Sequence, residues 1–147
     1  PPAPPTGVPV LARNRLTRVL SDELIDLYLA GLAAGPPVVG QVRALGGAVA
    51  RVARDATAFA HRDSEAFLSA VSLSPAPEAR TAFDAYWATL APHTGGAYGN
   101  LMSSLDPADL AELYPPDTRR RLVEVKRAYD PRNLFRQNFN IPPEATP

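Results

Sequence analysis

The stretch Val38-Val39-Gly40-Gln41-Val42-Arg43-Ala44-Leu45 alternates from one residue to the next, and this alternation is typical of a β-strand. Its even-numbered positions are small or apolar, whereas Gln41 and Arg43 share the opposite face. The stretch therefore predicts a strand of a sheet, with one apolar face and one polar face.

Further strands are expected on both sides of this stretch. Gly46-Gly47 turns the chain into the next segment, and Asp63-Ser64 marks a second turn. After that turn, residues 66–72 return as the antiparallel partner of residues 57–62. The additional strands expected are residues 8–16 at a sheet edge, 48–52, 57–62, 66–72 and 97–101.

Helix signals separate these strands. Ser21 supplies a capping hydroxyl before two acidic residues, and Gly35-Pro36-Pro37 ends the helix that follows. Together the elements predict an α+β fold, an antiparallel sheet with helices packed on one face. The expected helices are residues 21–35 with the apolar stripe Leu24, Ile25, Tyr28 and Leu32, residues 77–90 with Phe83, Tyr86, Trp87 and Leu90, one or two turns after Asp106-Pro107, and residues 116–128 with a face of Leu122, Val125 and Tyr129.

Composition excludes several classes of function. The 147 residues include 15 Lys and Arg against 15 Asp and Glu, so we expect no nucleic-acid partner and no membrane partner. The run Arg119-Arg120-Arg121 is interpreted as a solvated helix face. The absence of Cys excludes thiol chemistry, and two unrelated His residues without an acidic cluster predict no metal site.

His61 has the plainest catalytic interpretation of any residue. It shares one face of its expected strand with Thr57 and Phe59, and an imidazole can act as acid or base near neutral pH. The alternative is a hydrogen-bonded His at a sheet edge. No nucleophile accompanies it, so a hydrolase ranks below the other interpretations.

The segment Tyr129-Asp130-Pro131-Arg132-Asn133-Leu134-Phe135-Arg136-Gln137-Asn138-Phe139-Asn140-Ile141-Pro142-Pro143 combines a turn with amides and aromatic rings. Pro131 after a leading Asp predicts a type I turn. Phe135 and Phe139 can anchor the segment, while the amides match the C=O and N–H edge of a fused heterocycle. The alternative is a strap whose amides satisfy its own backbone. Residues 130–143 are called the strap below.

Three blocks of the sequence resemble the C-terminal part of the berberine-bridge-enzyme-like FAD-linked oxidases, flavoproteins of the vanillyl-alcohol-oxidase type. Together they span about residues 45 to 143, and many relatives carry Gln where Phe139 stands. The blocks are Leu45-Gly46-Gly47-Ala48 with Ala56-Thr57-Ala58-Phe59-Ala60-His61-Arg62, then Gly95-Gly96-Ala97-Tyr98-Gly99-Asn100, and finally Arg121 to Pro143.

The resemblance implies FAD as cofactor and a small organic molecule as substrate, with hydride transfer to the flavin and reoxidation by O2. The catalytic base stays open between His61, Tyr98 and a residue outside this sequence. The residues implied to lie near the flavin ring are Tyr98, Asn100, Asn138 and Asn140. The residues implied to line the substrate cavity are Phe59 and His61, with Gln41 and Arg43 as further candidates.

The family's FAD-binding half has no counterpart in these residues, and Met102 is the only Met. We therefore expect the C-terminal piece of a longer oxidoreductase, inactive alone, with FAD held mainly by the absent N-terminal portion. The expected division is residues 1–14 as an extended lead-in, 15–101 as the second part of the substrate-binding domain, and 102–147 as C-terminal helices and a strap that pack on the FAD-binding domain. The alternative is a non-catalytic α+β binding module, or one that forms a homodimer through an exposed sheet edge.

Overall fold

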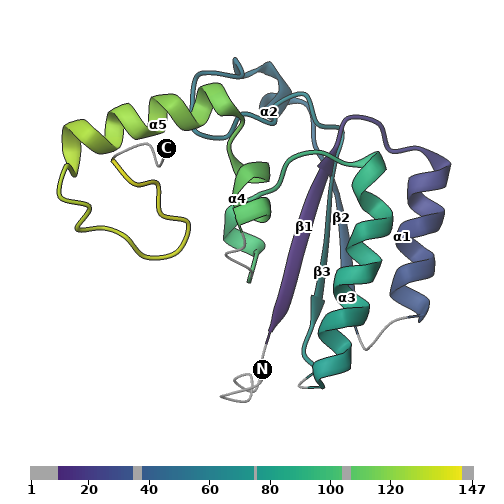
Figure 1. Cartoon of the computed structure of the whole chain (residues 1–147). Helices are drawn as coiled ribbons and strands as arrows, with labels where there is room; N and C mark the ends of the chain where they lie inside the picture. The colour runs from purple at the N-terminus through teal and green to yellow at the C-terminus, as the bar shows by residue number, and fades with distance from the viewer. Residues whose placement is uncertain (1–9, 35–37, 75, 104–106, 144–147) are drawn as a thin grey trace, which may run out of the picture.

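The computed structural model describes residues 10–34, 38–74, 76–103 and 107–143 (Figure 1). In these residues the chain forms a three-stranded antiparallel sheet, five α-helices and two short 3₁₀ segments. The strands are β1 (Leu11–Thr17), β2 (Val38–Ala44) and β3 (Ala66–Ser72), in the spatial order β1-β3-β2. The α+β class and the edge strand near the N-terminus are therefore confirmed.

The central strand β3 pairs along its whole length with β1 on one side and with β2 on the other. Every residue of β3 except Val71 is buried. Leu16 and Arg43 both stand opposite Phe67 in register. Because side chains alternate across a strand, these three side chains lie next to one another on one face of the sheet.

The helices α1 (Asp22–Ala34) and α3 (Pro77–Leu90) cover the opposite face of the sheet (Figure 1). Inside this layer the Tyr28 hydroxyl donates to the carbonyl oxygen of Ser69 at 2.6 Å, and the Tyr86 hydroxyl donates to that of Tyr28 at 3.1 Å. Burial raises the pKa of both hydroxyls, so they remain protonated donors. The core consists of Leu11, Leu24, Tyr28, Leu68, Ala70, Phe83, Tyr86, Trp87 and Leu90.

The single Trp of the chain belongs to this core. Trp87 is 2% exposed, and its ring centroid lies 6.2 Å from that of Phe83 and 5.5 Å from that of Tyr86. Its indole Nε1 has no hydrogen-bond partner among the described residues. The apolar stripe expected for the helix over residues 77–90 is confirmed by this packing.

The start of α1 follows the sequence signal. Ser21 Oγ accepts a hydrogen bond from the backbone N–H of Leu24 at 3.2 Å, and Asp22 and Glu23 occupy the first turn. The expected stop at Gly35-Pro36-Pro37 lies outside the described residues.

The remaining helices lie away from α1 and α3 (Figure 1). They are α2 (Ala48–Arg51), α4 (Pro107–Leu113) and α5 (Pro116–Tyr129), and the 3₁₀ segments are η1 (Ala91–His93) and η2 (Gly99–Leu101). The buried carboxylate of Asp109 in α4 binds Arg13 and Arg15 of β1, at 3.3 and 3.2 Å. The helices expected after Pro107 and over residues 116–128 are therefore confirmed. The apolar face of α5 is uncovered, since Val125 is 53% exposed and Tyr129 is 86% exposed.

Two expected strands near the glycine turns are wrong. Residues 48–52 begin with α2 instead, after Gly46 and Gly47 adopt φ angles of 144° and 50°. Residues 97–101 contain η2 instead of a strand. Of the lead-in expected over residues 1–14, residues 11–14 belong to β1, and residues 1–9 lie outside the described residues.

The expected strand over residues 57–62 is wrong for a local reason. Thr57 Oγ1 accepts from the N–H of Phe59 at 3.3 Å, and Arg62 Nε donates to the Phe59 carbonyl at 3.0 Å. These side chains occupy backbone groups that a strand would pair with its neighbour. Residues 66–72 do form a strand, but its antiparallel partners are β1 and β2.

The strap begins at Asp130, directly after α5. The carbonyl oxygen of Asp130 accepts from the N–H of Asn133 at 3.0 Å, which confirms the expected turn. The Asp130 carboxylate accepts from the N–H groups of Leu134 and Phe135 at 2.7 and 3.0 Å, and it pairs with Lys126 Nζ at 2.6 Å. The Lys126 hydrogen bond, helped by the two amides, lowers the pKa of Asp130 below its usual value.

We predict that Gly31→Ala destabilises the protein, although Ala normally favours a helix interior over Gly by about 1 kcal/mol. A Cβ at this position would lie 2.0 Å from Cδ2 of Tyr86, so α1 and α3 would have to separate. Overpacking of this kind costs about 1–3 kcal/mol. Thermal unfolding followed by circular dichroism should show the lower midpoint. Gly95→Ala is the matched control, because a Cβ there meets nothing within 4 Å. A midpoint for Gly31→Ala at or above that of the unaltered chain would contradict the packing.

We predict that the strap loosens in acid. The pKa of Asp130 is lowered in the folded state, so its ionised form contributes stability above the unfolded pKa, and that contribution is lost as the pH falls through the folded pKa. Hydrogen-exchange protection of the Leu134 and Phe135 amides should fall over that acid range. In Asp130→Asn the protection should already be low at neutral pH. Asp117→Asn is the control, since that exposed carboxylate pairs with Arg120. Equal losses in both variants would refute the role of Asp130.

Candidate functional site

The face of the sheet opposite α1 and α3 carries an open cavity of about 420 Å³. Leu16 and Phe67 are its buried floor, with Arg43 of β2 beside them. Of the residues expected to contact a substrate, Arg43 and Phe59 line this cavity, whereas the exposed Gln41 does not. The lining residues are Leu16, Arg43, Leu45, Val49, Phe59, Arg62, Phe67 and Tyr98.

Three aromatic rings and two guanidinium groups contact one another in this cavity. Tyr98 stands edge-to-face against Phe59 and Phe67, with ring centroids 6.2 and 6.4 Å away. The guanidinium carbon of Arg43 lies 5.9 Å from the ring centre of Phe67, and that of Arg62 lies 5.0 Å from that of Phe59. The cavity therefore combines an apolar lining with two cationic groups.

A buried side chain that sequence reasoning missed holds the backbone of Tyr98. Asn14 of β1 is 0% exposed, and its Oδ1 accepts from the N–H of Tyr98 at 2.7 Å. Its Nδ2 donates to the carbonyl oxygens of Tyr98 and Leu101 at 2.8 and 3.0 Å. These bonds occupy the groups that a strand over residues 97–101 would have used. The sequence does contain a signal for this role, since Asn14 lies on the same face of the expected strand as Leu16. An amide that is buried on such a face needs hydrogen-bond partners.

A smaller hollow of about 220 Å³ shares Phe59 and Tyr98 with the cavity. Asn100 lines it, and its Nδ2 donates to the Tyr98 hydroxyl oxygen at 2.8 Å. Phe139 of the strap packs on η2, where a Cβ added to Gly99 would lie 3.0 Å from its ring. The structure thus brings the strap against the segment that carries Tyr98 and Asn100.

The asparagines of the strap have unusual backbone and side-chain settings. Asn133 and Asn138 adopt φ angles of 51° and 57°, which Asn tolerates better than most residues. The N–H of Asn140 donates to the carbonyl oxygen of Asn138 at 2.9 Å. The buried Oδ1 atoms of Asn133 and Asn140 have no hydrogen-bond partner in the described part of the chain. A buried acceptor without a donor is unfavourable, so these two side chains are strained points of the strap.

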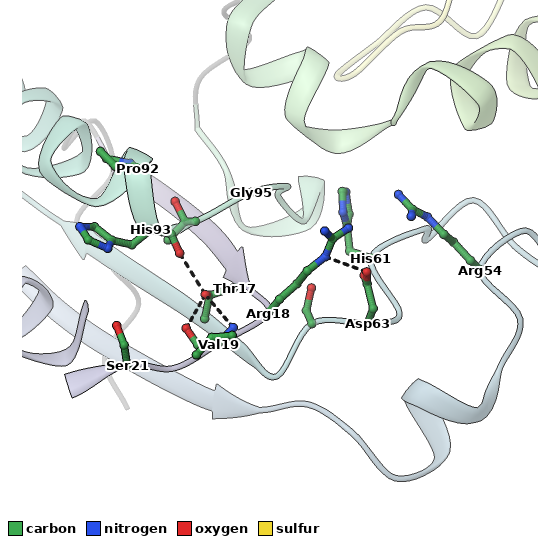
Figure 2. A pocket seen from close by; sticks show the side chains of 12 residues that line it. Thr17, Arg18, Val19, Ser21, Arg54, His61, Asp63, Pro92, His93 and Gly95 are labelled. Carbon is green, nitrogen blue, oxygen red and sulfur yellow. Dashed lines mark hydrogen bonds and ion pairs between the residues drawn. The ribbon is translucent and has the colours of Figure 1, made fainter. Parts of the chain in front are cut away.

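His61 faces a different hollow, of about 520 Å³, from the cavity that Phe59 lines (Figure 2). Its Nε2 lies 3.1 Å from the carbonyl oxygen of Glu112 and 3.2 Å from that of Leu113. That nitrogen therefore carries the proton and donates to α4. A Cβ on Gly96 would lie 2.4 Å from the imidazole, so the ring is packed on one side.

Several polar groups of this third hollow bind one another (Figure 2). Arg18 and Asp63 form an ion pair at 2.7 Å. The Thr17 hydroxyl contacts the carbonyl oxygens of Val19 and His93 at 2.8 and 3.0 Å. The candidate site is therefore the open-face cavity and the hollow beside the strap.

Within the described residues, no group of three or more His, Cys, Asp or Glu side chains could hold a metal ion. None of the helices in that part of the chain is both long enough and apolar enough to cross a membrane.

The sequence matches known flavoprotein oxidoreductases. The family model described as berberine and berberine like matches residues 112–142. (R)-6-hydroxynicotine oxidase from Paenarthrobacter nicotinovorans is 54% identical over 37 residues, which are 25% of this chain and 8% of that protein. An FAD-linked oxidoreductase from Dictyostelium discoideum is 33% identical over 104 residues, which are 67% of this chain and 22% of that protein.

The fold also matches a solved structure. A chitooligosaccharide oxidase shares it with a TM-score of 0.77 at 19% identity, over 92% of this chain and 33% of that chain. The matched part is therefore a third or less of the length of each of these relatives. By these matches, the chain belongs to the berberine-bridge-enzyme-like FAD-linked oxidoreductases and corresponds to their C-terminal region.

Proposed function

We propose that this chain is the C-terminal part of an FAD-dependent oxidase, in which it forms one wall of the substrate cavity and a strap beside the flavin. The packing of Phe139 against Gly99 carries this proposal, because it joins the strap to η2 next to the cavity. When bound, FAD supplies the acceptor for a hydride from a substrate C–H bond and passes the electrons to O2.

On the cofactor side, four residues would meet the flavin ring. The position of Phe139 supports this assignment, because this residue stands between Asn138 and Asn140 and lines one hollow with Tyr98 and Asn100. The left-handed backbone of Asn138 turns the strap at that point. The four residues are Tyr98, Asn100, Asn138 and Asn140.

On the substrate side, Arg43 and Phe59 line the cavity and would bind and orient the substrate, whereas Gln41 lies outside that lining. For proton transfer we favour Tyr98 over His61. The Tyr98 hydroxyl accepts from Asn100 and its side chain is 40% exposed, whereas the Nε2 of His61 already donates to α4. His61 then acts as a positioning residue.

The partner of this chain would be the FAD-binding portion found in longer relatives. Exposed apolar side chains on α5 and the strap support such a contact, because a free surface of this kind is unfavourable in water. The substrate-domain part would run to about residue 101 and include β1, and residues 102–147 would pack on the FAD-binding domain. FAD would be held mainly there, so the chain alone would be inactive. The exposed apolar side chains are Val125, Tyr129, Leu134 and Phe135.

A non-catalytic module is the second candidate. In the described residues β2 pairs with β3 on one side only, and Val39 is 74% exposed. An uncovered strand of this kind can pair with a second copy of the chain. The module would then be a homodimer that ignores FAD.

We predict that the natural product of the gene encoding this chain is longer than 147 residues and contains one flavin per chain. Intact mass and flavin absorbance of the purified protein measure both quantities. Light scattering and an FAD titration separate the two candidates. A stable dimer of the 147-residue chain, indifferent to FAD and without a flavin-binding region upstream in the gene, would favour the module and sink the oxidase proposal.

We predict that Asn140→Ala weakens FAD binding by about tenfold, because one hydrogen bond to a buried amide is lost. A titration with FAD, in which quenching of the flavin fluorescence reports binding, measures the affinity. Gln137→Ala is the matched control, since it removes an exposed amide from the same strap. If both variants bind FAD as well as the unaltered protein does, Asn140 does not contact the flavin.

A further inference from the structure

We propose that the open-face cavity binds an aromatic carboxylate, a flat apolar molecule with one negative charge, and that Arg43 receives the charge. This inference rests on the proposed function, because it names the class of substrate for the same cavity. The lining of the cavity carries an excess of positive charge. The lining contains two Arg side chains and no Asp or Glu, although the chain as a whole has zero net charge.

Among the described residues, no carboxylate neutralises the two guanidinium groups of the cavity, those of Arg43 and Arg62. By contrast, Arg13, Arg15 and Arg18 each bind an Asp. The cationic charge in the cavity is therefore available to a ligand.

The setting of Arg43 leaves its hydrogen-bonding edge free. Its guanidinium carbon lies 5.9 Å from the centre of the Phe67 ring. Among the described residues, the N–H groups of this guanidinium donate no hydrogen bond. A planar guanidinium presents two parallel N–H groups that match the two oxygens of a carboxylate. Arg62 is less available, because its Nε and Nη2 donate to the Phe59 carbonyl and to Thr57 Oγ1.

The rest of the lining suits the body of such a ligand. Leu16 and Phe67 are buried, and the rings of Phe59 and Tyr98 stand at the side. A volume of about 420 Å³ lies within the range of small-molecule sites. With its carboxylate at Arg43, an aromatic molecule would extend over Phe67 toward the hydroxyl of Tyr98. The carboxylate would then orient the substrate without reacting.

The test is a calorimetric titration of the natural gene product with cinnamate and with cinnamamide, its neutral analogue. We expect cinnamate to bind about tenfold more tightly, as one charge-assisted hydrogen-bonded contact predicts. Added salt should reduce this preference, because it screens exposed charges. Equal affinities for the two compounds, or tighter binding of the amide, would overturn the proposal.

The variant Arg43→Gln should lower cinnamate affinity about tenfold and leave cinnamamide affinity unchanged. Arg43 is exposed on β2, so the variant is expected to fold. Arg51→Gln is the matched control, because it removes the same charge from exposed α2 outside the cavity. Equal losses in both variants would reduce the effect to net charge and contradict a site at Arg43.

Flavin absorbance of the same samples reports separately on the proposed function. A flavin-loaded protein without preference for cinnamate would refute the substrate class and leave the oxidase proposal standing. Binding of cinnamate at Arg43 by a protein without flavin would support the site and refute the oxidase proposal.

Discussion

The buried amide of Asn14 links the sheet to the segment that carries Tyr98 and Asn100. Its three hydrogen bonds attach residues 98–101 to β1 without any pairing of strands. Leaving such a buried group unpaired costs about 1–3 kcal/mol, so the bonds strongly favour one placement of η2. Tyr98 takes its position directly from Asn14. The strap takes its position indirectly, because Phe139 packs on Gly99.

The two faces of the sheet carry different groups of side chains: one face packs against the helices, and the other lines the cavity. One face of β3 contributes Leu68 and Ala70 to the core beneath α1 and α3, and the other contributes Phe67 to the open cavity. The alternation of a strand therefore assigns neighbouring residues of one short segment to two different tasks. The side chains that would touch a ligand are consequently not those that hold the helices on the sheet.

Local signals in the sequence were sufficient for α1, α3, α4 and α5, for β2 and for the turn at Asp130, but not for α2. Each depends on residues a few positions apart, such as Ser21 capping Leu24 or Asp130 accepting from Asn133. The family was also reached from short motifs. Residues 57–62 misled because their alternation suggests a strand, whereas Thr57 and Arg62 satisfy the local backbone.

Long-range partners were beyond such reasoning. Asn14 and Tyr98 are 84 positions apart, and nothing local to either residue indicates the other. Two residues that share one expected strand face, Phe59 and His61, line different hollows because the segment is irregular. Which residues share one cavity was therefore predicted less well than which segments carry them.

The position of Trp87 makes its fluorescence a probe of one layer of the molecule only. It is the only indole in the chain, it lies between Phe83 and Tyr86, and it belongs to the layer beneath α1 and α3. The site lies on the other face of the sheet. The emission wavelength of this indole therefore follows the opening of the helix layer to water, and local rearrangement around the open cavity leaves it unchanged.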